Sequence, residues 1–90
     1  GGSSQFMATT GGEETLVAVL PHHRGEHPEL SEQVVAEFGF TVAERNPTRA
    51  MLVTDKFGPY AIYETERRNP KSRFITRERL QTFVDGFALQ

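Results

Sequence analysis

The sequence contains no cysteine, which excludes disulfide bonds and any metal site built on thiolates. It also has no apolar run close to the ~20 residues of a membrane-spanning helix. The opening stretch, GGSSQFMATTGGEE, lacks the basic and apolar regions of a secretory signal. We therefore expect a cytoplasmic protein that has no membrane span and folds without disulfides.

The chain has 90 residues, of which 37% are hydrophobic and 24% are charged, as is typical of one small globular domain. A chain of this size buries roughly 60–65% of its extended surface, which is enough for one core. We expect residues 1–12 to be a disordered leader. Its Gly/Ser-rich start is interpreted as a cloning remnant that precedes a natural start at Met7. Residues 13–90 are expected to form a single α+β domain.

The formal net charge is −2, but the charges are unevenly distributed along the sequence. From residue 13 to residue 37, six glutamates stand against one base, Arg24. From residue 67 to residue 79, one acid, Glu78, stands against six bases: Arg67, Arg68, Lys71, Arg73, Arg77 and Arg79. If this separation also holds in space, the domain has an acidic and a basic pole that can steer a charged partner.

The apolar run TLVAVLP, at 15–21, predicts a short strand buried on both faces. A helix is expected next, because Pro28 suits its first turn and Gly39 suits a left-handed cap at its end. The apolar side chains between them recur at helical spacing and form one stripe: Leu30, Val34, Val35 and Phe38.

Three further segments, at 40–45, 50–55 and 60–66, are predicted to be strands joined by the turns NPTR and KFGP. Joined as hairpins, they form an antiparallel meander in which paired residues share a sheet face. One face is expected to be the core face: Phe40, Val42, Met51, Val53, Tyr60 and Ile62. The other face is mixed in polarity and is expected to be open: Thr41, Ala43, Arg45, Ala50, Leu52, Ala61, Tyr63 and Thr65.

The sequence closes with a second predicted helix, at 76–89. Thr76 suits its N-cap, and Leu80, Phe83, Val84 and Phe87 recur at helical spacing. The expected order is therefore strand, helix, three-stranded meander, helix: an α+β domain with both helices on one sheet face. Val42 and Phe83 are both placed in its single core.

All three histidines fall in the segment PHHRGEHPE, at 21–29, as His22, His23 and His27. With Glu26 they could supply enough ligands for zinc. However, Gly25 and Pro28 disfavour the helix that would bring histidines four residues apart together. We therefore interpret the segment as a polar loop with no metal.

Catalytic signatures are also missing, because the sequence has neither a Gly-x-Ser-x-Gly elbow nor a glycine-rich phosphate loop. Glu64 and Glu66 alternate onto one face of the expected strand, but nothing indicates an apolar pocket that would separate their pKa values. We expect no enzyme activity, no catalytic residues and no cofactor.

The features that remain favour a small regulatory or adaptor module that binds a protein partner or itself. The mixed sheet face offers Leu52 and Tyr63 as an apolar patch beside Arg45. The two charge poles suit electrostatic steering of the partner. The expected partner-binding residues combine this face with the basic segment: Arg45, Leu52, Tyr63, Arg67, Arg68, Lys71 and Arg73.

The alternative is a nucleic-acid-binding domain that uses the basic segment 67–79. Its bases could neutralise phosphates, while Phe57, Tyr63 or Phe74 could stack on unpaired bases. The net acidic composition disfavours this alternative, since nucleic-acid-binding domains usually have a pI above ~9.

We predict that zinc does not stabilise the fold. A bound ion would raise the melting temperature by mass action. Thermal unfolding with a modest excess of zinc should therefore give the same Tm as unfolding with a chelator. A rise of several degrees that His23→Ala removes would contradict the polar-loop interpretation.

Overall fold

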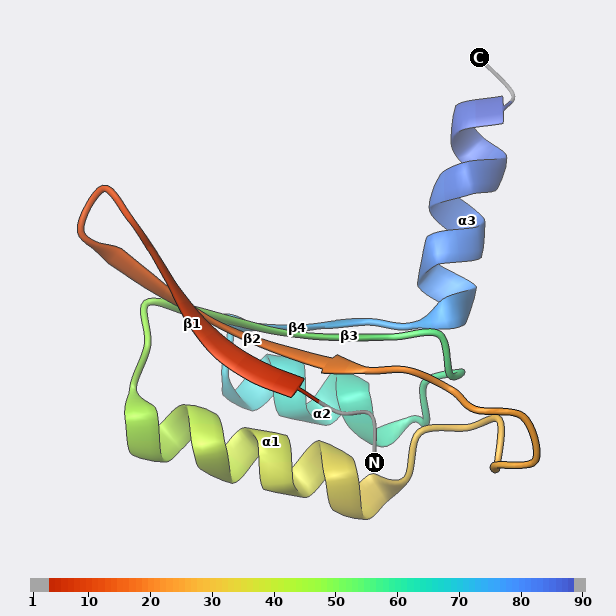
Figure 1. Ribbon diagram of the computed structural model, residues 1–90, viewed down its shortest axis with the longest axis horizontal. Coiled ribbons are helices and arrows are strands. Elements are labelled where there is room, and N and C mark those ends of the chain that lie inside the picture. The colour runs from red at the N-terminus through yellow and green to blue at the C-terminus, as the bar shows by residue number, and fades with distance from the viewer. Residues whose placement is uncertain (1–3, 89–90) are drawn as a thin grey trace.

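The computed structural model describes residues 4–88, which form a small α+β fold with four strands and three helices (Figure 1). The strands make one sheet in the order β1-β2-β3-β4. The elements along the chain are β1 (Ser4–Thr10), β2 (Glu13–Leu20), α1 (Glu32–Arg45), β3 (Arg49–Thr54), α2 (Ala61–Arg68), β4 (Ser72–Ile75) and α3 (Arg77–Ala88).

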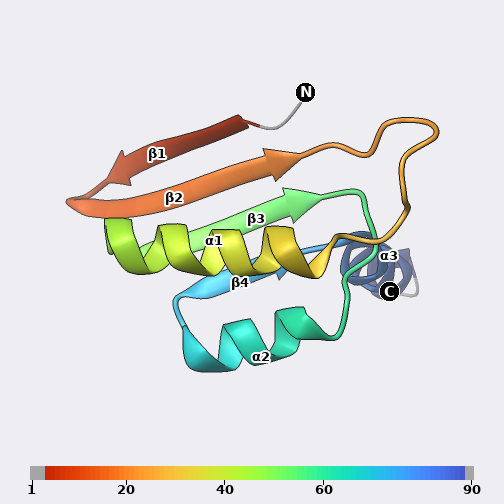
Figure 2. The same cartoon turned by 90° about the horizontal axis from the view of Figure 1, so that it is seen from below.

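The sheet is mixed. β1 and β2 are antiparallel and joined by Gly11 and Gly12, both at positive φ, as a tight two-residue hairpin requires. β2, β3 and β4 are parallel, so each pair is joined by a crossover that contains a helix. Both crossover helices, α1 and α2, lie on the same face of the sheet (Figure 2). α3 instead rises from the end of β4 on the opposite side, so the expectation that both predicted helices lie on one sheet face is wrong (Figure 1).

The expectation that residues 1–12 are a disordered leader is wrong for Ser4–Thr10, which form the edge strand β1. This strand pairs with the whole of β2, from Ser4 opposite Val19 to Thr10 opposite Glu13. Met7, on its inner side, packs against the core. Residues 1–3 and 89–90 lie outside the described part of the chain.

α1 begins and ends later than predicted. The Ser31 hydroxyl accepts a hydrogen bond from the Val34 N–H (3.2 Å), and the left-handed Asn46 closes the helix with its N–H on the Val42 carbonyl (2.9 Å). The expected strand at 40–45 is therefore wrong. Val42 continues the stripe of Val35 and Phe38 past Gly39, so the helix gains core burial by continuing through the glycine.

The expected strand at 60–66 is also wrong, because these residues belong largely to α2. The first turn forms at Pro59 and Tyr60, whose carbonyls accept from the N–H groups of Ile62 and Tyr63. Ile62 is the one buried residue of this helix. With both outer strands replaced by helices, the antiparallel meander becomes a parallel sheet with crossovers.

The core lies between the sheet and the two crossover helices. The rings of Phe38 and Phe74 meet edge to face at its centre, with 5.3 Å between centroids. Strand residues facing the helices are buried because the side chains of a strand alternate between faces. The buried apolar residues are Leu16, Leu30, Val35, Phe38, Val42, Ala50, Leu52, Ile62 and Phe74.

The predicted core set is confirmed for Val42 and Ile62 and wrong elsewhere. The faces of the strand at 49–54 are reversed, since Leu52 is buried while Met51 and Val53 point to the other side of the sheet. Three further predicted core residues are mainly exposed: Phe40, Tyr60 and Phe83. Two segments predicted as strands are helices, so the predicted strand pairing, and with it the predicted division of residues between the two sheet faces, does not hold.

We predict that Leu52→Ala destabilises the fold by about 2–5 kcal/mol, because it leaves a cavity in the core. Met51→Ala should cost about 1 kcal/mol or less, because Met51 is half-buried on the other face. Urea unfolding of both variants at one protein concentration measures the difference. An equal loss of stability in the two variants would contradict the observed faces of β3.

Candidate interaction surface

Among residues 4–88, no helix covers one face of the sheet, and the middle of this face is apolar. We call this surface the open face. Directly paired residues share it, so Val17 lies between Phe6 and Met51, and Val53 lies between Val19 and Ile75. Phe6 is 51% exposed and the other five are half-buried. Parallel strands are normally covered on both faces, so this surface lacks a usual layer.

Charged residues stand at the margins of the open face. Arg49 and Glu13 lie at the end of the sheet nearest the β1–β2 turn, where their side chains approach to 4.0 Å and are largely exposed. Arg73, on the edge strand β4, pairs with Met51 and is exposed. The face thus has an apolar middle and a polar margin, the arrangement typical of protein interfaces.

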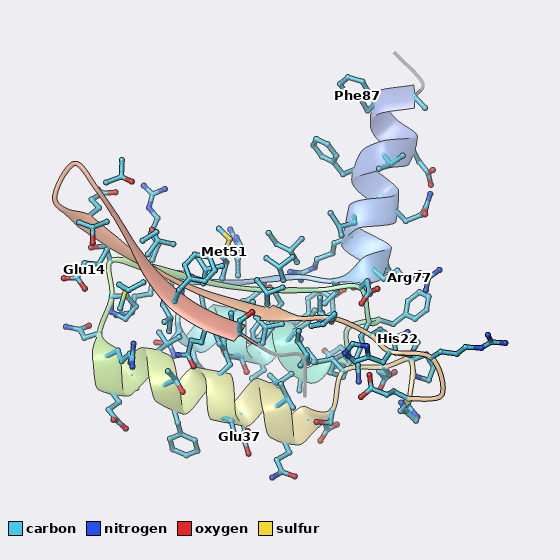
Figure 3. All side chains as sticks on the ribbon, in the orientation of Figure 1. Glu14, His22, Glu37, Met51, Arg77 and Phe87 are labelled. Atoms are coloured by element: carbon cyan, nitrogen blue, oxygen red, sulfur yellow. The ribbon has the colours of Figure 1, made fainter. Side chains whose placement is uncertain are left out.

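α3 carries an apolar stripe that no part of residues 4–88 covers. The stripe consists of Leu80, Phe83, Val84 and Phe87, and α3 has no buried residue. The two phenylalanines are about 70% exposed, at 72% and 69%. Phe87 lies on the side of α3 that faces the space above the open face (Figure 3). Phe83, one helical turn earlier, shares that side.

The position of α3 is set by an ion pair between Glu66 of α2 and Arg79 in the first turn of α3. Both guanidinium nitrogens donate to the carboxylate, at 2.6 and 3.0 Å, in the bidentate geometry that arginine favours. Arg79 also donates to the Phe74 carbonyl (2.8 Å), and Glu66 accepts from the Phe74 N–H (2.8 Å). The pair therefore connects α2, β4 and α3.

Glu78 makes a second anchor beside the first. Its carboxylate accepts from the Gly58 N–H (2.8 Å) and from the Thr76 hydroxyl. Gly58 is needed for this approach, because a Cβ there would lie 2.7 Å from Ile62 Cδ1. The neighbouring Arg77 lies over the Phe57 ring, 5.3 Å from its centroid. The base of α3 is thus held on two sides.

The two anchoring carboxylates stay ionised. Partial burial alone would raise the pKa of Glu66, but the hydrogen bonds from Arg79 and the Phe74 N–H, with the nearby positive charges, outweigh it and lower the pKa below 4.5. The pKa of Glu78 is lowered in the same way, since the bonds from Thr76 and Gly58 outweigh its burial. Hydrogen bonding to Glu66 raises the pKa of Arg79.

The partner-binding residues expected from the sequence do not form one surface. Leu52 is buried under the helices, so the expectation that it lies on an exposed face is wrong. Tyr63, 52% exposed, lies on α2, where the guanidinium of Arg79 stacks on its ring at 5.1 Å. Arg45 is exposed at the end of α1. Of this set, only Arg73 lies on the open face.

The basic segment is also divided among different surroundings. Arg67 and Arg68 are exposed at the end of α2, where Arg68 pairs with Glu64 at 2.8 Å. The Lys71 ammonium donates to the Asn46 side chain (2.7 Å). Arg79 is taken up by Glu66. The run of positive charge in the sequence is therefore not a continuous stripe in space.

The histidine loop follows β2 and lies at the carboxyl edge of the parallel strands, where His22 is labelled in Figure 3. Its polar groups bond locally. The His22 N–H donates to Asp55 (2.5 Å), and the His23 N–H donates to Glu26 (2.7 Å), which lowers the pKa of Glu26. Within residues 4–88, no three histidine, aspartate or glutamate side chains converge as metal ligands.

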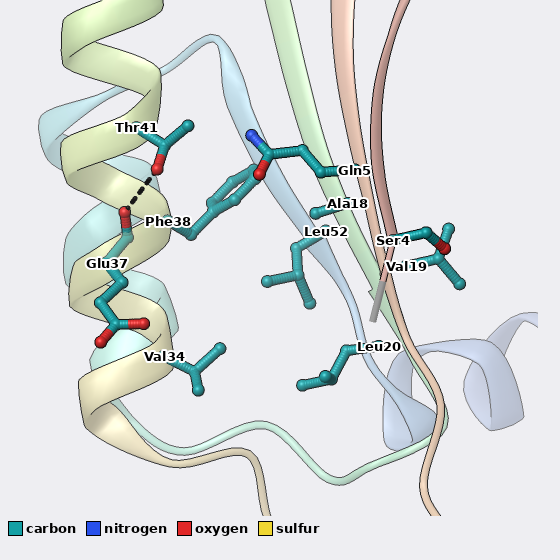
Figure 4. A pocket seen from close by; sticks show the side chains of 10 residues that line it. All are labelled: Ser4, Gln5, Ala18, Val19, Leu20, Val34, Glu37, Phe38, Thr41 and Leu52. Carbon is teal, nitrogen blue, oxygen red and sulfur yellow. Dashed lines mark hydrogen bonds between the residues drawn. The ribbon is translucent and has the colours of Figure 1, made fainter. Parts of the chain in front are cut away.

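A groove of about 420 Å³ lies on the helix side of the sheet, between the β1–β2 hairpin and α1 (Figure 4). It forms because α1 leaves the edge strand uncovered (Figure 2). Its walls are largely apolar, including Leu20, Val34 and Phe38, and its polar groups are Ser4, Gln5, Glu37 and Thr41. The Thr41 hydroxyl donates to the Glu37 backbone carbonyl (3.0 Å).

No family model, curated protein or solved structure matches the chain significantly. No helix within residues 4–88 is long and apolar enough to cross a membrane.

The exposure of α3 was not predicted from the sequence. The spacing of Leu80, Phe83, Val84 and Phe87 predicts an amphipathic helix, which is confirmed. An amphipathic pattern is the same whether the stripe packs on its own core or remains available to another chain. The prediction that Phe83 lies in the core is therefore wrong for a reason that periodicity could not reveal.

We predict that Glu66→Gln lowers the free energy of unfolding by about 1–3 kcal/mol at neutral pH, because it breaks a charge-assisted, partly buried pair. The folded-state pKa of Glu66 is depressed, so its stabilisation is complete above the ordinary value of 4.5 and is lost as the pH falls through the folded-state pKa. Urea unfolding as a function of pH should show the two proteins converging in acid.

The matched control is Glu64→Gln, on the same helix. Glu64 pairs with Arg68 on the surface, so this change should cost less than about 0.5 kcal/mol. Equal losses for the two variants, or a Glu66→Gln effect that persists unchanged in acid, would contradict the anchoring role of Glu66.

Proposed function

We propose that this chain is a non-enzymatic protein-interaction module that binds a protein partner, or itself, through the open face and the stripe of α3. One observation carries the proposal. Four apolar side chains of α3 stand exposed on a helix whose base is anchored so that it rises away from its own core. Contiguous exposed apolar surfaces of this kind mark sites where another surface binds.

The shape and composition of the surface suit a protein better than a small ligand. The open face is a sheet surface rather than an enclosed cavity, and small-molecule sites are concave. Phenylalanine, methionine and arginine, which are enriched at interfaces, all occur on it as Phe6, Met51 and Arg73. The adjoining stripe of α3 adds two further phenylalanines. These features support a protein occupant.

The surroundings of the titratable groups support a role without catalysis. The His22 ring bonds to the Glu26 carbonyl, and the His27 ring bonds to the backbone of Glu29. Glu66 and Glu78 hold α3 in place. Each of these groups therefore has a structural partner, and the proposal includes no reaction step.

The division of the basic segment gives less support to nucleic-acid binding than its sequence did. A strand of nucleic acid is held by positive charges that follow its backbone. Here Arg73 stands on the open face, while Arg67 and Arg68 stand at the end of α2 on the side of the helices. Protein binding is therefore the proposal that the arrangement favours.

We predict that Phe83→Asp abolishes capture of proteins from native extract by the immobilised chain, because it places a charge in the stripe. Phe40→Asp is the matched control, since Phe40 is equally exposed but lies on α1. Capture by the wild type and by Phe40→Asp should be equal and insensitive to nuclease. Capture that nuclease abolishes, or that Phe83→Asp retains in full, would contradict the proposal.

A further inference from the structure

We infer that the occupant of this surface is a second copy of the chain. In the resulting dimer the two α3 helices pack antiparallel, stripe against stripe, and the end of each helix lies over the partner's open face. This inference rests on the proposed function and names its partner. Self-association uses the stripe and the open face of the same chain, neither of which is covered by another element of the described residues 4–88.

The stripe cannot reach its own sheet while the base of α3 is held. Glu66 and Arg79 fix the first turn against α2 and β4, and Glu78 fixes it against Gly58. The stripe begins at Leu80, directly after this anchored turn, and the helix continues away from the sheet (Figure 1). Its 12 residues extend about 18 Å, so its end stands well above its own open face.

A two-fold axis allows the stripe of each copy to be buried in the same way. A half-turn about an axis perpendicular to the plane of Figure 1 brings a second α3 down beside the first, with its direction reversed. Phe87 faces the space above the open face, so each stripe then faces the other across this axis (Figure 3). Such an interface is isologous and closes with two copies, as in most homodimers. The stripe itself carries no charge that would oppose pairing with its own copy.

The spacing of the elements places the partner's helix end near Arg73. Arg73 precedes Arg77 by four residues, which is about 13 Å of extended chain along β4. Packed helices lie 8–10 Å apart, so the partner's α3 descends toward this part of the open face. α3 has no basic residue in its last turn, and its terminal carbonyls carry partial negative charge. Arg73 supplies the complementary positive charge.

The apolar area of the α3 stripe alone is too small for a stable dimer, so the interface must also include part of the open face. The two phenylalanines of one stripe present roughly 280 Å², taking about 200 Å² for a fully exposed side chain. A stable interface buries about 800 Å² per partner. Leu80 and Val84 add to the stripe, but the requirement is met only if the helix end also covers part of the open face. The inferred geometry does this in both copies.

Sedimentation velocity on the wild-type chain at micromolar concentration should show a dimer. Phe83→Asp should raise the dissociation constant at least about 30-fold, the effect of losing one central contact. Phe40→Asp should leave it unchanged. Arg73→Glu should weaken the dimer several-fold, whereas Arg67→Glu, on α2, should not. Circular dichroism of each variant shows whether it is folded.

The antiparallel geometry has its own test, because the chain has no cysteine and one introduced cysteine is unique. Val84 lies near the middle of the stripe, so Val84→Cys should form a disulfide-linked dimer under mild oxidation. Leu80→Cys, at one end of the stripe, should not link to itself. Thr82→Cys, on the opposite side of α3, should not link either. Self-linking at Leu80→Cys would overturn the antiparallel arrangement.

A monomeric wild-type chain would overturn the inference. Two further measurements, hydrogen exchange in α3 and binding of a hydrophobic dye, would then show whether the proposed function also fails. Dye binding and fast exchange in α3 would mean that the stripe is free for a different protein, so the proposed function would stand alone. Slow exchange without dye binding would mean that α3 covers its own sheet, and both proposals would fail.

Discussion

The ion pair between Glu66 and Arg79 determines where α3 lies relative to the sheet, and so whether its apolar stripe is exposed. It connects α2, β4 and the first turn of α3, and both partners have further bonds to the backbone of Phe74. Because the pair is bidentate and partly buried, it sets the direction of α3 as well as its position. An apolar helix without this anchor would be free to fold onto the nearest apolar surface, which is its own open face.

With α3 held away from the sheet, residues 4–88 form two layers, the sheet and the helices α1 and α2. Parallel strands are usually covered by helices on both faces, which would make three layers. α1 and α2 cover one face of the parallel strands, and burial of Leu16, Leu52 and Phe74 there supplies the core. The middle of the opposite face is also apolar, and no helix in the described part of the chain covers it. The hydrophobic effect therefore favours a further layer on the open face, and the stripe of α3 is an apolar surface of suitable kind.

The sequence predicted local features well, but it did not predict which strands pair or which residues share a sheet face. The strand predicted at 15–21, the apolar stripe of α1 through Phe38 and the amphipathic pattern of α3 follow from spacing alone. All three elements are confirmed, but the expected burial of the strand on both faces is wrong, because Val17 and Val19 are only half-buried. The segments at 40–45 and 60–66 are too short for their apolar pattern to separate a strand from a helix. Assigning them as strands gave the wrong faces for Met51 and Leu52, because side-chain alternation is meaningful only once the pairing is known.

By itself, the sequence determined that this is a small α+β chain without disulfides, with two amphipathic helices and a basic run in its second half. These properties depend on residue types and on neighbours within a few positions. Only the tertiary structure decided that the strands run parallel, that Arg79 binds Glu66 thirteen residues away, and that the stripe of α3 is left exposed. Those outcomes depend on contacts between segments that are far apart in the sequence. The residues of an apolar stripe do not indicate which surface will cover it.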